Sequence, residues 1–350
     1  MLLYREGETG SQADLASTIS LLPTAYLEEL ELDQFSSPTL RSALSEVVQR
    51  LNTCFKVLVT ESSLSDAAWK HLASLPKLQL LRVSDTPSPE VLKSTPHENG
   101  FPALERVKIK VDNLCQRWSF FFSLLESSPL QHVSVANRGI KHVDVPSQVT
   151  IAMLKTRLPR SVNTLKFTGF DPANLTFISN LGPFGSLKAL CCNTQCRGPG
   201  RCVSPLTDSD IERLTSGLPQ LESIWLGHEC KYCFHSTTIK SMISLSTHCL
   251  SLKSFRLPCN FTEISEDVKA ESGEPDPRLK VRSPCVLEFF AFQWVTMPPP
   301  EDIEALRIVA SALHHLFPRL RLGGFGDAWK TTLDVVKDFR RGELDAAHTI

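Results

Sequence analysis

The sequence predicts an α/β fold assembled from repeated units, and three observations support this prediction. A short segment patterned L-x-x-L-x-L recurs along the whole chain, as in "LPKLQLLRV" at 75–83 and "LPQLESIWL" at 218–226. An apolar stretch with helical spacing, usually followed by a proline, precedes each copy. Ten intervals separate the last apolar residues of successive copies between Leu32 and Leu322, so the average period is 29 residues. This period is typical of leucine-rich repeats.

The alternation within each copy indicates how the copies are arranged. Side chains alternate along a strand, so the two apolar residues of x-L-x-L point to one side and the residues between them to the other. One strand can bury its apolar side chains only beside a neighbouring strand. We therefore predict a leucine-rich-repeat solenoid, a horseshoe with irregular repeats of about 29 residues and parallel strands on its concave face. The last apolar residues of the copies are Leu32, Val59, Val83, Ile109, Val135, Phe167, Cys192, Leu226, Leu257, Phe292 and Leu322.

Three departures from the repeat pattern define the expected domain organisation. Residues 1–14 are expected to be a disordered N-terminus, and the solenoid is expected to span 15–322. Within it, the charged segment 263–284 carries prolines and lacks apolar periodicity, so it is interpreted as a disordered surface insertion. Residues 323–350 contain a glycine hinge and one amphipathic helix, which is a natural cap for the last repeat.

The segment "LTDSDIERLTSGL" at 206–218 shows how the helices between the strands are expected to begin. Its apolar residues recur with helical spacing, and Asp208 or Ser209 is the expected N-cap. Asp208 and Asp210 form a carboxylate pair at the start of this helix, where negative charge complements the helix dipole. We interpret the pair as helix capping rather than as an acid–base site.

Composition excludes several classes of partner. The chain has 37 basic and 38 acidic side chains, and a formal net charge of -1 argues against bulk attraction to nucleic acid or to an anionic membrane. No apolar run reaches the length of roughly 18 to 20 residues that a membrane-spanning helix needs. The sequence turns polar after three residues, so it lacks the apolar core of a secretory signal. A cytoplasmic or nuclear location is expected, with the eleven cysteines mostly as free thiols.

Strong catalytic motifs are missing from the sequence. It contains no phosphate loop, dinucleotide fingerprint, G-x-S-x-G elbow or H-E-x-x-H helix. The glycine-rich "LGGFG" at 322–326 is not followed by the lysine of a phosphate loop and is interpreted as a hinge. We therefore expect a binding protein rather than an enzyme.

Two cysteine-rich stretches, "CCNTQCRGPGRC" and "GHECKYCFH", follow the expected strands that end at Cys192 and Leu226. Loops after adjacent parallel strands emerge at the same edge of a sheet, so these stretches are expected to lie close together. Zinc prefers four soft ligands in a tetrahedron, and His228 or His235 could replace one thiolate. Unliganded thiols, a zinc site and a redox pair remain open interpretations. The candidate ligands, which we call the loop cysteines, are Cys196, Cys202, Cys230 and Cys233.

A second candidate site consists of the residues between the buried apolar positions, which are expected on the concave face. After an acidic first strand, five consecutive strands present a basic side chain or a histidine there, and later strands add aromatic residues. A merely solvated face would also be polar. The functional interpretation is a groove for an acidic or phosphorylated protein segment. The acidic strand has Glu29 and Glu31, and the candidate binding residues are Lys56, Arg82, Arg106, Lys108, His132, Lys166, Trp225, Arg256 and Phe289.

The phrases "LTDSDIERL", "LPQLESIWLGH" and "TTIKSMISLSTHC" within residues 191–257 resemble a family of fungal F-box proteins with irregular leucine-rich repeats. The resemblance implies target recognition by the repeats, and an N-terminal F-box that binds a Skp-type adaptor of a ubiquitin ligase. The first repeat begins by Leu22, so no F-box is expected in this chain. The chain is then either a recognition part that lacks its F-box or a truncated relative without function, with a zinc-binding or enzymatic thiol module as the alternative.

Overall fold

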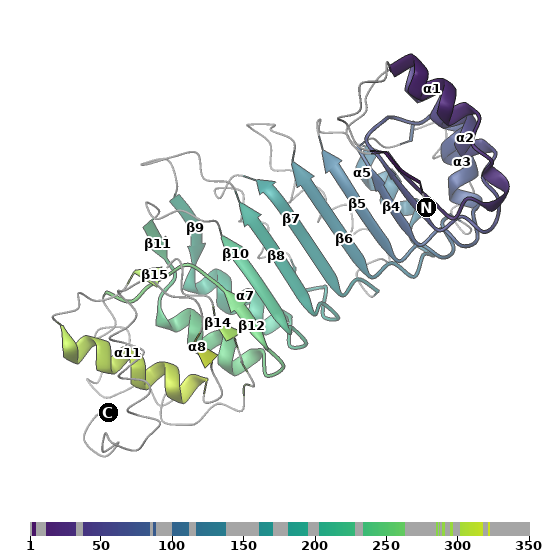
Figure 1. Cartoon of the computed structure of the whole chain (residues 1–350). Helices are drawn as coiled ribbons and strands as arrows, with labels where there is room; N and C mark the ends of the chain where they lie inside the picture. The colour runs from purple at the N-terminus through teal and green to yellow at the C-terminus, as the bar shows by residue number, and fades with distance from the viewer. Residues whose placement is uncertain are drawn as a thin grey trace. The chain divides into compact units, whose positions relative to one another are not determined.

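In the computed structural model of the protein, the chain forms two compact units, Met1–Gly169 and Phe170–Ile350, which we call the first and the second unit. Both units combine parallel strands with α-helices, so the fold belongs to the predicted α/β class (Figure 1). The structure describes residues 2–4, 12–32, 38–84, 87–88, 100–111, 117–137, 161–170, 181–194, 203–227, 234–262, 285, 287, 289–290, 295–296, 302–317 and 321–322.

In its described part, the first unit has seven parallel strands, and each pairs with the strand that comes next in the chain. The pairing is in register, so that Leu30 lies opposite Leu58, and Leu58 opposite Leu81. Each crossover connection therefore returns the chain in the same direction, as repeated strand–helix units require. The strands are β1 (Leu2–Tyr4), β2 (Glu29–Leu32), β3 (Val57–Thr60), β4 (Leu80–Val83), β5 (Arg106–Val111), β6 (His132–Asn137) and β7 (Thr164–Phe170).

Helices occupy the connections from β1 to β4 and the connection between β5 and β6. Helix α3 begins where the N-cap side chain of Ser65 accepts a hydrogen bond from the Ala68 backbone nitrogen at 3.3 Å. Helix α2 buries Leu40, Leu44 and Val47, whose spacing places them on one face. The described helices of the first unit are α1 (Gln12–Ser20), the 3-10 helix η1 (Thr24–Tyr26), α2 (Pro38–Gln49), α3 (Asp66–Ser74) and α5 (Arg117–Leu124).

The second unit repeats this plan and adds short strands to it. Its main sheet has the order β8-β10-β12-β14-β16, and the pairs β9–β11 and β13–β15 form two small sheets of their own. The strands are β8 (Ala189–Thr194), β9 (Val203–Thr207), β10 (Ser223–Gly227), β11 (Phe234–Ser236), β12 (Ser254–Arg256), β13 (Cys259–Asn260), β14 (Phe289–Phe290), β15 (Val295–Thr296) and β16 (Arg321–Leu322). The described helices are α7 (Asp208–Gly217), α8 (Ile239–His248) and α11 (Ile303–Leu316).

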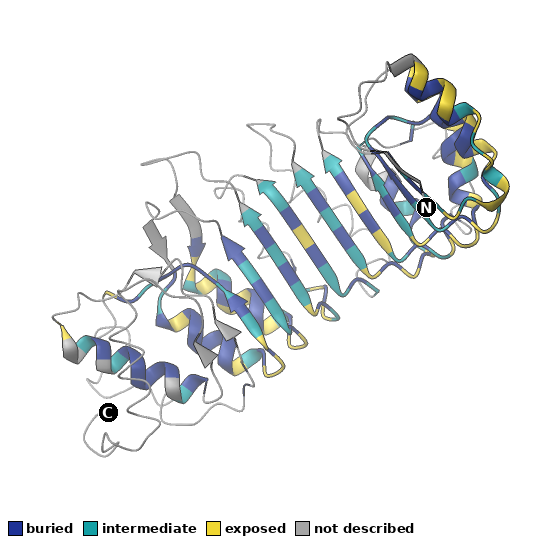
Figure 2. Cartoon of the chain, in the orientation of Figure 1, coloured by how far each residue is buried: buried dark blue, intermediate teal, exposed yellow. Residues whose placement is uncertain are grey.

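The core of each unit lies between its sheet and its helices. Strand residues alternate between buried and more exposed, and the helices bury one side (Figure 2). Aligned residues of neighbouring strands form continuous buried rows, because the strands are in register. In the first unit one row consists of Leu30, Leu58, Leu81, Val107, Val133 and Leu165, each at most 1% exposed.

Residues that the strand register aligns are not evenly spaced along the chain. In the first unit, 23 to 32 residues separate successive members of the row that begins at Leu30. In the second unit the spacing is 31 to 35 residues, where the extra strands lengthen the connections. The expected period of 29 residues is therefore an average over shorter and longer repeats. The second-unit row consists of Leu190, Ile224, Phe255, Phe290 and Leu322.

In two copies of the motif, the residue at the final apolar position is not the expected one. In β3 the residue aligned with Leu32 is Thr60, which is 1% exposed, and not Val59. The hydroxyl oxygen of Thr60 accepts a hydrogen bond from the Ser62 backbone nitrogen at 3.0 Å, so a polar side chain is tolerated in the core. In the last copy, Leu322 aligns with Phe290, and through it with Phe255, so it matches the first apolar position of the motif rather than the final one.

The N-terminus also differs from expectation. Leu2–Tyr4 form strand β1, which pairs in parallel with β2, and helix α1 begins at Gln12. The apolar "LLY" lies at the edge of the sheet, where it adds one strand beside β2. The expected insertion 263–284 and the expected C-terminal hinge and helix at 323–350 lie outside the described residues. None of the helices in the described part of the chain has the length and apolar character that a membrane-spanning helix needs.

Candidate functional site

The face of the first-unit sheet that lies opposite its buried rows carries most of the predicted binding residues, and we call it the outward face. The strand register places its side chains in two complete rows. One row consists of Glu29, Val57, Leu80, Arg106, His132 and Thr164. The other row consists of Glu31, Val59, Arg82, Lys108, Ser134 and Lys166.

Charge is unevenly distributed along these rows. The acidic residues lie on β2, whereas β4, β5 and β7 carry arginine and lysine. Arg106, Lys108 and Lys166 are exposed, and strands lie about 4.8 Å apart. Arg82 is directly opposite Lys108, an arrangement of like charges that is unfavourable unless an anion lies nearby.

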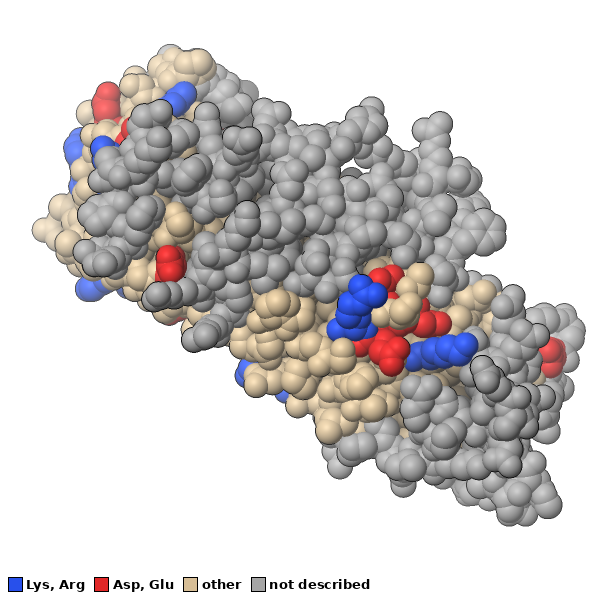
Figure 3. Space-filling view, turned by 180° about the vertical axis from the view of Figure 1, so that it is seen from behind, with Lys and Arg blue, Asp and Glu red and all other residues tan. Residues whose placement is uncertain are grey.

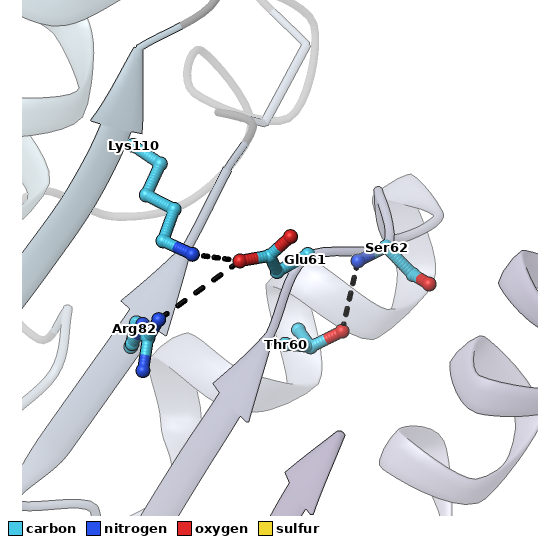
Figure 4. A network of polar contacts seen from close by, with 5 residues as sticks. All are labelled: Thr60, Glu61, Ser62, Arg82 and Lys110. Carbon is cyan, nitrogen blue, oxygen red and sulfur yellow. Dashed lines mark hydrogen bonds and ion pairs between the residues drawn. The ribbon is translucent and has the colours of Figure 1, made fainter. Parts of the chain in front are cut away.

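Such an anion is provided by Glu61, which follows β3 directly (Figure 4). Its Oε1 atom contacts the Lys110 ammonium and lies 3.9 Å from a guanidinium nitrogen of Arg82. The Glu61 side chain is 9% exposed, and those of Arg82 and Lys110 are 25% and 24% exposed. The carboxylate therefore joins β3, β4 and β5 on the outward face and places one negative charge beside two cations.

His132 lies on β6, between Arg106 on β5 and Thr164 on β7. Burial of the imidazole lowers the pKa of His132, the neighbouring Arg106 lowers it further, and Glu105 acts in the opposite direction. The ring is therefore uncharged at neutral pH, and the positive charge of this face comes from lysine and arginine.

Lys56 does not belong to the outward rows, which corrects its predicted position. It precedes β3, and its ammonium donates a hydrogen bond to the Glu28 carboxylate at 2.8 Å. This hydrogen bond raises the pKa of Lys56 and lowers that of Glu28. The prediction failed because "KVLVT" offers apolar or β-branched residues at successive positions, and its alternation did not reveal which of them point inward.

Lys110 and Glu61 are charged residues of the outward face that the repeat pattern did not indicate. Lys110 continues the alternation of "RVKIKV" two residues beyond Lys108, so a longer strand would have revealed it. Glu61 carries no comparable signal, because its contacts join residues that are 49 positions apart in the sequence.

The second unit presents a different kind of surface. Cys191, Trp225 and Arg256 are aligned on neighbouring strands, and the guanidinium carbon of Arg256 lies 4.3 Å from the centre of the Trp225 ring system. A cation at this distance over an indole is a favourable cation–π contact. The register places Phe289 opposite Ser254, and its side chain lies outside the described part of the structure.

On the helix side of the second unit, basic and acidic residues are not separated as they are on the outward face of the first unit. Seen from behind, acidic and basic side chains lie next to each other there (Figure 3). Exposed residues of both signs alternate on its helices, for example Glu212, Arg213 and Lys240. The concentration of one sign on β4, β5 and β7 is therefore not a general property of the described surface.

The loop cysteines and His228 lie outside the described residues, as does the side chain of His235. Within the described ranges, no group of three or more His, Cys, Asp or Glu side chains could hold a metal ion. Six cysteines in these ranges are free thiols, and burial raises the pKa of Cys192 well above its usual value and that of Cys249 to about 12. The Cys249 thiol donates to the Leu218 carbonyl oxygen at 3.6 Å, so it packs against the preceding repeat as a neutral group.

Comparisons with known proteins do not assign the chain to a family. No family model matches it, and no curated protein matches it in sequence. Among solved structures, it is similar to a chain in the crystal structure of the Rad7 and Elc1 complex in yeast. The sequence identity is 18%, 82% of each chain is covered, and the TM-score is 0.34. At this score the likeness carries no argument about fold or function.

Proposed function

We propose that the chain is a leucine-rich-repeat scaffold that recognises another protein, and that the outward face of the first unit binds an acidic segment of that protein. The observation that carries the proposal is the set of basic residues on neighbouring strands, in particular the exposed Arg106, Lys108 and Lys166. In this proposal the face is the concave side of the predicted horseshoe, and the protein binds its target without transforming it chemically.

The spacing of the strands suits an extended peptide better than a small molecule. Four strands about 4.8 Å apart span roughly 14 Å, which is the length of about four extended residues. Each exposed ion pair contributes only about 0.5 kcal/mol, so affinity requires several contacts together. Salt is therefore expected to weaken the interaction, because it screens exposed charges.

The sequence resemblance to F-box proteins motivates a more specific role, the recognition of a substrate for a ubiquitin ligase. In that role the acidic segment can also be a phosphorylated one, and a Skp-type adaptor would bind only through an F-box located upstream. Trp225 and Arg256 belong to the residue types that dominate binding energy at protein interfaces. We propose their stacked pair as a protein contact of the second unit.

A charge-reversal experiment tests the proposed binding face. The probe is a fluorescent peptide of about eight residues that alternates Glu and Ser, and its affinity is measured by fluorescence anisotropy at low and high salt. Arg106→Glu together with Lys108→Glu is compared with Arg41→Glu together with Lys70→Glu. The control residues are exposed on helices α2 and α3 of the same unit, and both variants change the net charge equally.

The outward-face variant is expected to lose about 30-fold in affinity. Each reversal replaces an attraction of about 0.5 kcal/mol with a similar repulsion, so two reversals cost about 2 kcal/mol. The helix variant is expected to change affinity less than threefold. Equal losses in both variants would mean that only net charge matters, and the proposal would then be wrong.

A further inference from the structure

The basic residues of the outward face fall into two groups that differ in their surroundings. Arg82 and Lys110 contact the carboxylate of Glu61, and about three quarters of each side chain is covered. Arg106, Lys108 and Lys166 are exposed. Lys108 and Lys110 lie on the same strand, two residues apart, and point to the same face, so the difference between them arises from Glu61 and its surroundings.

Glu61 competes for Arg82 and Lys110 more effectively than a carboxylate of a peptide from solution. Its attachment to the end of β3 keeps its carboxylate beside Lys110 and Arg82 (Figure 4). A tethered group competes at an effective concentration of the order of millimolar or higher. Because the Glu61 side chain is only 9% exposed, it is also held by its packing. A peptide carboxylate that contributes a weak individual contact does not displace it.

We infer that Glu61 is an internal ligand that withdraws Arg82 and Lys110 from partner binding, and so confines recognition of an acidic segment to β5–β7. The inference rests on the proposed function of the outward face. It makes Glu61 a specificity-determining residue, because it sets where along the sheet an acidic segment binds. Removing its charge takes one negative charge from the neighbourhood of Arg82 and Lys110, so the outward face attracts an acidic segment more strongly.

A comparison of two lysine variants tests the inference, with the affinity for the same Glu-Ser peptide as the measurement. Lys108→Gln is expected to lower the affinity about twofold, whereas Lys110→Gln is expected to change it less than about 1.5-fold. Both variants remove one positive charge from β5, so each is the matched control of the other. Equal losses in the two variants would overturn the inference and leave the proposed binding face intact.

A double-mutant cycle gives the second test. Glu61→Gln is expected to raise the affinity about twofold or more, and Lys110→Gln made in that background is expected to lower it about twofold. Glu46→Gln, on the exposed side of α2, controls for net charge and is expected to have little effect. A Glu61→Gln variant that binds the peptide no better than Glu46→Gln would contradict the inference.

Binding of the wild-type protein to two peptides shows whether the inference alone fails or the proposed function fails as well. If the wild-type protein does not bind the acidic peptide better than a matched Gln-Ser peptide, the proposed function and the inference both fail. Thermal unfolding of each variant shows whether it is folded. If Glu61→Gln does not fold, the comparison of Lys108→Gln with Lys110→Gln decides alone.

Discussion

Replacement of Asp208 is expected to destabilise the second unit far more than its place at a helix start suggests. The N-cap of α7 is Thr207, one residue before the expected position, and Asp210 completes its capping box. This leaves the Asp208 carboxylate free to reach the start of α8, 30 residues later in the chain. It accepts hydrogen bonds from the backbone nitrogen and hydroxyl of Thr238, both at 2.8 Å, and from those of Ser241 at 3.1 and 2.5 Å.

The loss of stability in Asp208→Ala arises because hydrogen-bond donors lose the carboxylate as their acceptor. The Ser241 hydroxyl belongs to a residue that is 0% exposed, so it would lose its acceptor without gaining water. An unsatisfied buried group costs about 1–3 kcal/mol, and the charge at the start of α8 adds a further 0.5–1 kcal/mol or so. We expect a total of about 3 kcal/mol, or a fall of roughly 6–12 °C in the melting temperature for a unit of this size.

Urea and thermal unfolding followed by circular dichroism measure this effect. Asp210→Ala is the matched control, because it removes the same side chain two residues away and affects only the exposed capping box of α7. Its expected cost is about 1 kcal/mol. If the two variants are destabilised equally, or if Asp208→Ala costs less than Asp210→Ala, the inter-helix role of Asp208 is refuted.

Two further predictions concern protonation and metal binding. The lowered pKa of His132 means that the unfolded chain binds a proton before the folded chain does, so stability is expected to fall as the pH drops below about 6.5. A bound acidic peptide favours the charged imidazolium form of His132, so the affinity of the protein for the peptide should rise when the pH falls from 7 to about 5.5. Peptide titrations of a His132→Gln variant should lack this rise in affinity. The same rise in the variant would exclude His132 as the cause. If the loop cysteines form a zinc site, purified protein carries about one equivalent of zinc and a chelator lowers its melting temperature. Zinc content that persists when all four are replaced by serine would exclude them, and Cys54→Ser, at an exposed free thiol, is the control.

Alternation along single strands made much of the fold predictable. Leu81 and Val83 point inward and Arg82 between them points outward, because the geometry of a strand decides this locally. The same reasoning failed in β3, where Leu58 and Val59 are both apolar and the buried Thr60 is polar. In β3, pairing with the neighbouring strands determines which residues point inward, and a single copy of the motif does not contain that information.

The contacts that organise the surface depend on packing between repeats and were not predictable. The pairing of Glu61 with Lys110 requires that β3 and β5 lie one strand apart with their ends aligned. The hydrogen bonds from Thr238 to Asp208 likewise require that α7 and α8 lie side by side. Sequence patterns located these elements, but they did not set the distances between side chains of different repeats.

The most direct test of the proposed binding face is to map where an acidic peptide lies. The Glu-Ser peptide, carrying a photoreactive benzophenone, is cross-linked to the wild-type protein, and the modified residues are identified by mass spectrometry. We expect cross-links on β5, β6 and β7, within 106–111, 132–137 and 164–170, and we expect an excess of unlabelled peptide to abolish them. Competed cross-links that fall instead on helices α2 and α3, or only in the second unit, would contradict the proposed binding face.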